Sequence, residues 1–340
     1  MSRTRSLKAT LVQKIDSAGA WEAHISSALG PGYWLVGAQH MFQTRLLVFA
    51  RMDVIPYIQN VWAHFEATGL GRVGLNKGGV AIMLRMGMTQ LAFVGSHLAA
   101  HQGECARRNQ DVAEIIKELC PPHVGRANLV SGPHHVVWMG DLNYRLDWGE
   151  QAASMAESPS AEDHADIVRR VQGQDYGSLL ETDQLAREMR EGRVFGGFAE
   201  APIAFPPTFK VIKGTPGLAY GLKRSPAWCD RVLVRSNLPH KPAAFGAYFC
   251  APDVATSDHK PVAAVLQLPL VTPRALVSER CKPFRLYLCA ARLLGEGTWK
   301  ALSQLMNERL LGPNGAMLRL MVSGPELAGG GKEQVGRAPG

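Results

Sequence analysis

The chain has 340 residues, of which 46% are hydrophobic and 19% are charged, and its formal net charge is +8. This length and apolar content allow one large α/β domain with a tail, or two ordinary domains, and exclude wholesale disorder. The positive charge suits an anionic partner, such as a phosphorylated small molecule, nucleic acid or an acidic membrane surface, without choosing among them.

Hydrophobic periodicity, glycine and proline divide most of the chain into alternating helices and strands. Pro56 is read as the first turn of a helix, and Gly87 as a turn between two strands. In chain order we predict a helix within 1–30, a strand over 46–51, a helix over 56–65, a glycine-rich loop over 69–79, strands over 79–86 and 90–97, a helix over 104–119, a strand over 135–141, a polar exposed segment over 150–175, a helix over 179–189, a long connection over 202–224, and strands over 228–235 and 261–268.

This alternation predicts a layered α/β domain over residues 1–270. The following segment, 271–322, is predicted to be a helical extension, with one or two helices over 284–311. Residues 323–340 are rich in glycine and proline, which predicts a disordered tail.

The six cysteines form no Cys-x-x-Cys pair and show no zinc spacing, which predicts reduced thiols and a cytoplasmic protein. The basic N-terminus is not followed by an apolar stretch, so it does not resemble a secretory signal. No apolar run approaches the roughly 18 residues that a membrane span needs, so no transmembrane segment is expected.

Polar side chains gather at the ends of the predicted strands, where α/β proteins place reacting groups. Asp141 and Asn143 are two positions apart, so both side chains can point the same way from an extended loop. One can accept a proton from water while the other donates to a phosphoryl oxygen, and His259 offers a cation that a carboxylate can hold. The strand-end residues are His97, Asp141, Asn143, Asp230, Asp258 and His259.

Two long blocks carry a resemblance to a known family: Trp138–Arg145 (WMGDLNYR) and Pro226–Leu233 (PAWCDRVL). Shorter matching blocks follow the family's order and are Asn76–Val80, Ser96–His101 with Arg107–Asp111, Phe205–Lys210 and Thr256–Val262. From about residue 20 to about residue 270 the sequence resembles the inositol polyphosphate 5-phosphatases of the endonuclease/exonuclease/phosphatase superfamily.

The resemblance implies a DNase I-like four-layer sandwich, in which two mixed β-sheets are flanked by helices. It implies Mg²⁺-dependent removal of the 5-phosphate from phosphoinositides such as PI(4,5)P2 or from soluble inositol polyphosphates. Asp141 would activate water and Asn143 would stabilise the transition state. His259, polarised by Asp230, would bind the scissile phosphate. Two further roles are implied, for His97 at the phosphoryl group and for Asp258 near the metal.

Basic and phenolic groups near these blocks are candidates for holding a neighbouring ring phosphate, because phosphate is doubly charged and accepts several hydrogen bonds. A solvated surface charge is the alternative interpretation of each lysine and arginine. The candidates are Lys77, Tyr144, Arg145, Lys210, Lys223, Arg224 and Arg231.

The family has two further motifs before the matched region, one with an Asn near the nucleophile and one ending in the Glu that binds Mg²⁺. That Glu is expected upstream of Met1 and is absent, and the fold is expected to lack its first two, interior, strands. Three explanations stay open: an incomplete piece of a longer sequence, a truncated product with little activity, or recruitment of another acid.

Two alternatives to the phosphatase stay open at this point. A nuclease on the same scaffold shares the Asp-x-Asn and Asp-His pairs, although the blocks at 205–210 and 226–233 favour the phosphatase. The other is a catalytically impaired inositide-binding or regulatory fragment, motivated by the absent Glu. Nucleic acid is not the expected partner, and peripheral contact with an anionic membrane is permitted by the basic charge.

Overall fold

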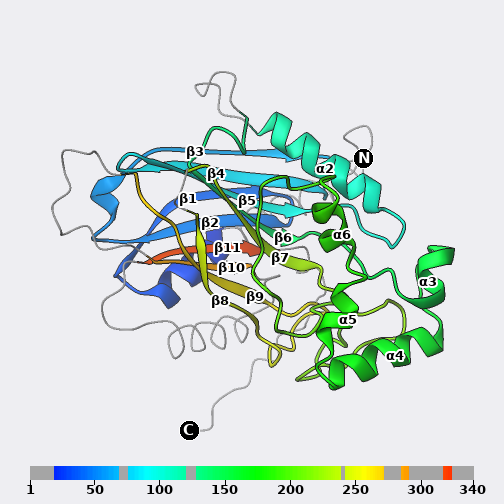
Figure 1. Ribbon diagram of the computed structural model, residues 1–340. Coiled ribbons are helices and arrows are strands. Elements are labelled where there is room, and N and C mark those ends of the chain that lie inside the picture. Colours follow the sequence, from blue (N-terminus) through cyan, green and yellow to red (C-terminus); the bar gives the residue numbers. More distant parts are fainter. Residues whose placement is uncertain are drawn as a thin grey trace, which may run out of the picture.

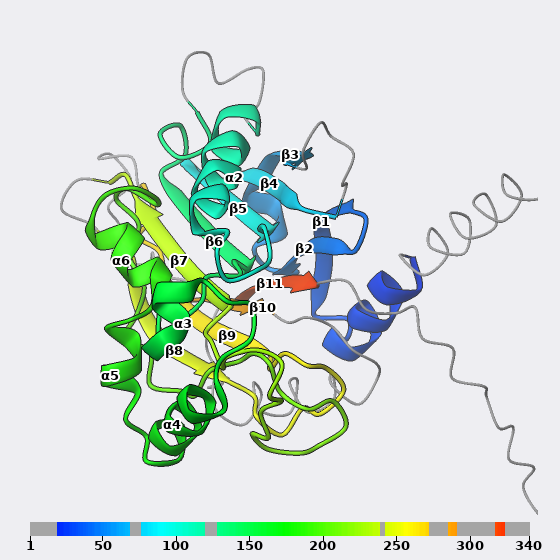
Figure 2. The same ribbon diagram turned by 90° about the vertical axis from the view of Figure 1, so that its right-hand side faces the viewer.

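The computed structural model describes residues 19–68, 76–119, 128–238, 242–271, 285–290 and 317–323. Two β-sheets pack face to face, and helices cover their outer sides, so that the described chain has four layers (Figures 1 and 2). Among the described residues, no helix is long and apolar enough to cross a membrane.

The first sheet has five strands, and in spatial order they are β3 (Ile58–Ala67), β4 (Gly78–Met86), β5 (Thr89–His97), β6 (His135–Asp141) and β7 (Asp230–Ser236). The sheet is mixed, because β5 and β6 are parallel while its other neighbours are antiparallel. The strands β4, β5 and β6 are buried over nearly their whole length because both of their faces are covered, whereas the edge strand β3 is mostly exposed.

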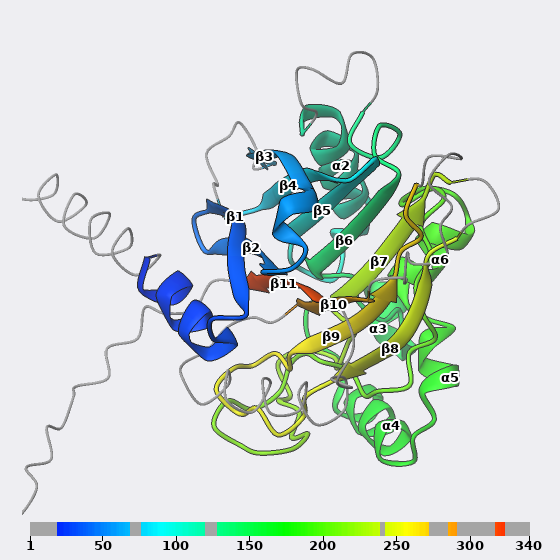
Figure 3. The ribbon, with the colours of Figure 1, turned by 90° about the vertical axis from the view of Figure 1, so that its left-hand side faces the viewer.

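The second sheet has six strands, and its two central neighbours, β11 and β10, are parallel to each other. Figure 3 shows these two short strands, in red and orange, between β2 and β9. In spatial order the strands are β1 (Tyr33–Met41), β2 (Thr44–Arg51), β11 (Met317–Ser323), β10 (Arg285–Ala290), β9 (Val262–Gln267) and β8 (Ala244–Cys250).

The main core lies between the two sheets, where alternate residues of each strand point inward. On β4, Val80 and Ile82 face this core, while Ala81 faces α2 (Cys105–Glu118) on the outer side. The helix over 19–29 packs on the outer face of the six-stranded sheet through Ile25. Burial on both sides of both sheets gives the strand ends a rigid support.

Most of the predicted strands and the helix over 104–119 are confirmed, with ends shifted by a few residues. The prediction of a helix over 56–65 is wrong, since a 3₁₀ turn at Ile55–Tyr57 leads directly into β3. A register shift between Gln59 and Trp62 interrupts the period of two along β3, so its apolar residues imitate helical spacing. Proline fits the 3₁₀ turn as well as it fits the start of a helix.

The predicted helix over 179–189 is two helices, α5 (Tyr176–Leu180) and α6 (Gln184–Arg190). The carboxylate of Asp183 accepts a hydrogen bond from the backbone N–H of Ala186 and so begins α6. The polar segment over 150–175 holds α3 (Gly149–Ser154) and α4 (Ala161–Gln172), and β1 and β8 had no sequence prediction.

The segment after residue 271 differs most from the sequence-based expectation. Its described parts, Arg285–Ala290 and Met317–Ser323, are strands, so the predicted helical extension is wrong there. The centre of the six-stranded sheet is occupied by these two strands, β10 and β11. Residues 1–18, and the predicted tail after Ser323, lie outside the described residues.

Candidate active site

Functional side chains stand in a row along one edge of the five-stranded sheet. The register pairs His97 with Asp141 across β5 and β6, and Asp141 with Asp230 across β6 and β7. On the other side His97 pairs with Gly78, which Lys77 precedes. Neighbouring strands lie about 4.8 Å apart, so adjacent strand ends bring these groups together although they are far apart in sequence.

His259 reaches this row from the loop before β9 in the other sheet. Its Nδ1 lies 2.9 Å from Oδ2 of Asp230, and its Nε2 lies 3.9 Å from Oδ2 of Asp141. The hydroxyl of Thr208 donates to the same Asp230 oxygen at 2.7 Å, and the His259 backbone N–H donates to Ser257 Oγ. The imidazole is therefore held by a buried carboxylate and points its other nitrogen at Asp141.

Asp141 lies between two histidines. Its Oδ2 is 3.2 Å from Nε2 of His97 and 3.9 Å from Nε2 of His259. Lys77 Nζ is 2.5 Å from the same His97 nitrogen, so a cation lies beside this histidine. A carboxylate next to two imidazoles can orient a water molecule and take its proton.

The loop after β6 fixes the amide of Asn143. Gly140, the next-to-last residue of β6, has φ +135°, and a Cβ there would collide with the carbonyl oxygen of Ser96, so this position requires glycine. Asn143 has φ 56°, a left-handed conformation that asparagine tolerates. Its Nδ2 donates to the Leu98 carbonyl at 3.1 Å, and its Oδ1 accepts from Arg145 Nη2 at 2.7 Å. These two hydrogen bonds fix the orientation of the amide, and the second N–H of Nδ2 is left to donate to another acceptor.

These groups line a cavity of about 320 Å³, near the small end of the range for small-molecule sites. On its wall Lys210 Nζ donates to Asp258 Oδ2 at 2.8 Å, and Arg224 Nε lies 2.6 Å from Oε1 of Glu157. The cavity is thus lined by carboxylates, imidazoles and basic groups together. The lining residues are Asn76, Lys77, His97, Ala100, His101, Asp141, Asn143, Arg145, Glu157, Phe209, Lys210, Arg224, Asp258 and His259.

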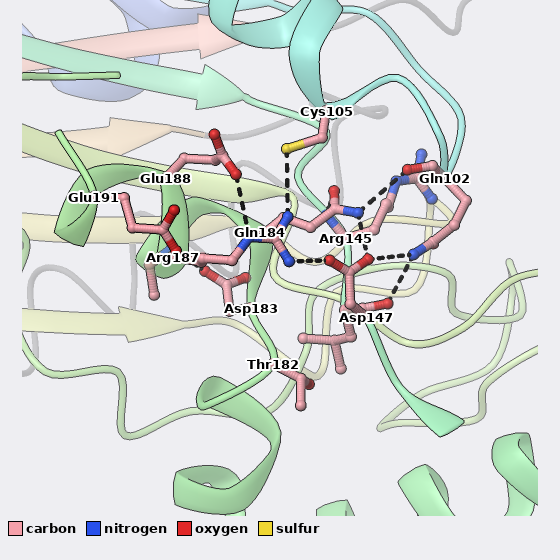
Figure 4. A network of polar contacts seen from close by, with 12 residues as sticks. Gln102, Cys105, Arg145, Asp147, Thr182, Asp183, Gln184, Arg187, Glu188 and Glu191 are labelled. Atoms are coloured by element: carbon pink, nitrogen blue, oxygen red, sulfur yellow. Dashed lines mark hydrogen bonds and ion pairs between the residues drawn. The ribbon is translucent and has the colours of Figure 1, made fainter. Parts of the chain in front are cut away.

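A network of polar side chains includes Arg145, which lines the cavity, and connects it with Gln102, Asp147, Gln184 and Arg187 (Figure 4). The side chain of Gln184 accepts from the Arg145 backbone N–H at 3.0 Å and donates to Asp147 at 2.7 Å. Gln102 also donates to Asp147, and Arg187 pairs with its other oxygen. These contacts fix the chain on both sides of Arg145, whose guanidinium faces the cavity.

The structure does not place three of the predicted substrate contacts on the cavity. Arg231 is fully buried, and its Nη1 forms an ion pair with both carboxylate oxygens of Asp183, at 3.0 and 3.1 Å. The hydroxyl of Tyr144 donates to Asn109 under the sheet, and burial raises the pKa of Tyr144 well above its ordinary value. Lys223 lies on the surface beside the cavity without lining it.

Three residues of the site were not assigned roles from the sequence. Thr208 and Phe209 belong to a block that matches the family, and this match is the one sequence feature that could have identified them as site residues. The Phe209 ring lies 4.6 Å from the His259 ring and carries the Arg145 guanidinium 4.4 Å from its centroid. Glu157 lies in a polar segment with no distinguishing pattern, and only the tertiary fold brings it to the cavity.

Asp141, Asp230 and His259 form a group whose ligand atoms lie within 4.8 Å of one another, so it could hold a metal ion. Oδ2 of Asp230 already contacts the Thr208 hydroxyl and Nδ1 of His259. The role that remains for this carboxylate is to orient those two side chains. Asp141 and Asp258 both line the cavity and offer the oxygen ligands that Mg²⁺ takes, usually only one or two from the protein. The side chains present therefore fit a hard divalent cation.

Comparison with known proteins gives a consistent result. A family model described as Endonuclease/Exonuclease/phosphatase family 2 matches residues 3–265. Inositol-1,4,5-trisphosphate 5-phosphatase 1 of Schizosaccharomyces pombe is 33% identical over 259 residues, which are 74% of this chain and 22% of that protein. The type II inositol 1,4,5-trisphosphate 5-phosphatase of Mus musculus is 34% identical over 255 residues, which are 73% of this chain and 24% of that protein.

Two solved structures share the fold. The inositol polyphosphate 5-phosphatase domain of SPsynaptojanin, in complex with inositol (1,4)-bisphosphate and calcium ion, has a TM-score of 0.58 and 34% identity, covering 69% of this chain and 62% of that one. A Cimex nitrophorin has a TM-score of 0.59 at 18% identity, covering 77% of this chain and 84% of that one, which is a likeness of fold alone.

The fold and the strand-end site place the chain in the endonuclease/exonuclease/phosphatase superfamily. Within that superfamily it belongs to the inositol polyphosphate 5-phosphatase family. The chain spans about a quarter or less of the length of the two relatives named above, 22% and 24%.

Proposed function

We propose that this protein is a Mg²⁺-dependent phosphomonoester hydrolase that removes the 5-phosphate from phosphoinositides such as PI(4,5)P2 or from soluble inositol polyphosphates. The observation that supports this best is that Asp141 and His259 line one cavity together with the basic side chains of Lys77, Arg145, Lys210 and Arg224. A phosphorylated ring needs both features, a reacting centre and cations for the phosphates beside it.

The chemical step follows from the hydrogen-bond geometry. Asp230 holds the imidazole of His259 by Nδ1, so that Nε2 can donate to a phosphoryl oxygen as negative charge grows on it. Asp141, 3.9 Å from that nitrogen, orients the attacking water and takes its proton. The remaining N–H of Asn143 donates to the phosphoryl group, and His97 contacts it from the other side.

Mg²⁺, when bound, would neutralise charge on the phosphoryl oxygens, and the carboxylate of Asp258, which lines the same cavity as Asp141, would hold it. Lys210 is hydrogen-bonded to Asp258, so one cationic side chain lies beside the proposed metal ligand. We infer that Lys210, Arg145 and Arg224 hold the ring phosphates that stay on the product.

A hairpin beside the cavity favours a lipid headgroup over a free inositol phosphate. Backbone hydrogen bonds from Ile212 to Ala219 and from Gly221 to Lys210 join its two sides. Ile212 and Leu222 are apolar yet 49% and 70% exposed, and each adjoins a lysine in the sequence. Exposed apolar side chains flanked by cations suit an anionic bilayer surface, which would bring the membrane-bound substrate to Lys210.

The test is phosphate release by the purified chain from PI(4,5)P2 vesicles and from inositol 1,4,5-trisphosphate, with Mg²⁺ and with EDTA. We expect release that EDTA abolishes and that Asp141→Asn lowers by at least about 100-fold, because the base is lost. Ile212→Ser with Leu222→Ser should lower activity on vesicles and spare the soluble substrate. The matched control is Met88→Ser, which alters an exposed apolar residue on the β4–β5 turn.

Two other results would replace this proposal. Inositide binding that survives Asp141→Asn and EDTA, without turnover by the native chain, would identify a binding module. Cleavage of DNA or RNA without inositide turnover would identify a nuclease on the same scaffold.

A further inference from the structure

Glu157 is a carboxylate in the wall of the active-site cavity that the proposed reaction does not use. It lies in the loop between α3 and α4, away from the strand ends that carry the reacting groups. Its Oε1 lies 2.6 Å from Nε of Arg224 and 3.1 Å from Nδ1 of His101, and its Oε2 accepts the backbone N–H of Gln102 at 2.9 Å. Both carboxylate oxygens are therefore held by the protein.

Hydrogen bonds on either side of Glu157 fix the loop that carries it. The hydroxyl of Ser158 donates to the Lys223 carbonyl at 3.1 Å. The hydroxyl of Ser225, two residues along, donates to Oε1 of Gln151, which belongs to α3. Because the loop and the facing segment are joined at both places, the carboxylate stays at this position on the cavity wall.

The Glu157 side chain carries a negative charge at neutral pH. Burial opposes its ionisation, but the Gln102 backbone N–H, followed by His101 and Arg224, outweighs burial and lowers the pKa of Glu157 below its ordinary value. The side chain is 33% exposed, so solvent and salt screen this charge only in part. A fixed anion thus stands in a cavity proposed to accept phosphates.

The charges that line the cavity nearly cancel. Apart from the imidazoles, four cationic side chains and three carboxylates line it, which leaves one positive charge in excess. Lys210 is paired with Asp258, and Arg224 is paired with Glu157. Arg224 also donates from Nη1 to the Lys223 carbonyl, so two of its nitrogens already contact the protein. Each phosphate monoester brings a charge of about −1.5 to −2, so this small excess suits few phosphates better than many.

We propose that Glu157 is a specificity-determining residue, which makes the site favour a ring that carries one phosphate beside the scissile phosphate over a ring that carries a second. This inference rests on the proposed function, which assigns the cavity to a phosphorylated inositol ring. A cavity of about 320 Å³ is near the small end for such sites, so an additional phosphate is held close to the carboxylate. The repulsion between like charges then acts against the more highly phosphorylated ligand.

The test compares kcat/KM for water-soluble short-chain forms of PI(4,5)P2 and PI(3,4,5)P3, which differ by one ring phosphate. We expect the native chain to favour PI(4,5)P2 by at least about 10-fold, because the additional phosphate meets the fixed carboxylate. Glu157→Gln should reduce this preference to within about threefold, chiefly through a higher kcat/KM for PI(3,4,5)P3. The change that the substitution causes should become smaller as salt is added, because salt screens the charge that it removes.

The matched control is Glu150→Gln, which removes the same charge at an exposed position in α3 that does not line the cavity. This control should keep the native preference, and thermal unfolding checks that both variants are folded. A Glu157→Gln chain with lower kcat/KM for both lipids would make Glu157 a support for Arg224 and would overturn the proposal. A native chain without a preference would overturn it as well.

Product binding separates this inference from the proposed function, because it needs no turnover. Calorimetry on the native chain and on Glu157→Gln would measure the affinities for inositol 1,4-bisphosphate and inositol 1,3,4-trisphosphate. A chain that releases no phosphate contradicts the proposed function, yet tighter binding of the bisphosphate that disappears in Glu157→Gln would still support the role of Glu157. Equal affinity of the native chain for both compounds would refute that role even in an active phosphatase.

Discussion

Asp230→Asn isolates the part that one buried carboxylate plays in the proposed reaction. Asp230 is 5% exposed, and its Oδ2 receives Nδ1 of His259 at 2.9 Å and the Thr208 hydroxyl at 2.7 Å. Asparagine keeps the volume but removes the negative charge that holds an imidazolium in place. A hydrogen bond to a charged group contributes about 1.5–3 kcal/mol. At about 1.4 kcal/mol for each factor of ten, kcat/KM should fall between about 10-fold and about 150-fold.

The assay is phosphate release from the substrate on which the native chain is most active. Thermal unfolding checks that the variant is folded. Thr208→Val is the matched control, because it removes a neutral hydrogen bond from the same oxygen, and we expect a loss below about 10-fold. A folded Asp230→Asn chain that keeps kcat/KM within about threefold would refute the proposed coupling of Asp230 to His259. A loss confined to KM would assign Asp230 to ground-state binding instead.

Three further predictions concern the wall of the cavity and its support. Glu157→Gln should lower KM several-fold, because Arg224 would lose the carboxylate 2.6 Å away and could bind a ring phosphate; steady-state kinetics showing a higher KM would contradict this. Arg231→Met should lower the free energy of unfolding by about 3–5 kcal/mol, because it leaves the fully buried Asp183 without its cation. Denaturant titration measures that loss, and unchanged stability with a raised KM would return Arg231 to the substrate site. Hydrogen bonds from Arg193, opposed by burial and joined by Asn109, lower the pKa of Glu188 from its ordinary 4.5 to about 2. The stabilisation from this ionised carboxylate is complete above pH 4.5 and is lost as pH falls through about 2. Glu188→Gln should flatten that decline in denaturant midpoints, and an unaltered acid limb would contradict the assignment.

The sequence predicted the parts of the fold that depend on local pattern. Every residue of β6 is buried up to Asp141 at its end, so the sequence could locate both the strand and the site residue on which it ends. β3 could not, because its bulge changes the spacing of the apolar residues, and the strand is recognisable only through its pairing with β4. β10 and β11 are interior strands that only long-range pairing defines.

The site divides in the same way. Strand-end position brought His97, Asp141 and Asp230 together, since adjacent strands fix their neighbours, and His259 reaches them from the loop before β9 in the other sheet. The sequence could not separate the basic residues that line the cavity from those that form buried ion pairs, because both kinds have the same local sequence pattern. Arg231 has 1% exposure and a carboxylate partner in the core, and this is a property of the packed chain alone.

The central position of β10 and β11 has a consequence for synthesis on the ribosome. Translation adds about 5–20 residues each second, so about 3–11 s separate the end of β9 at Gln267 from the end of β11 at Ser323. During that interval β2 and β9 have been made, but β11 and β10, which pair with their facing edges, have not. The nascent chain therefore carries two open strand edges until β10 and β11 emerge, which makes it a candidate for chaperone binding and sensitive to translational pauses after residue 267.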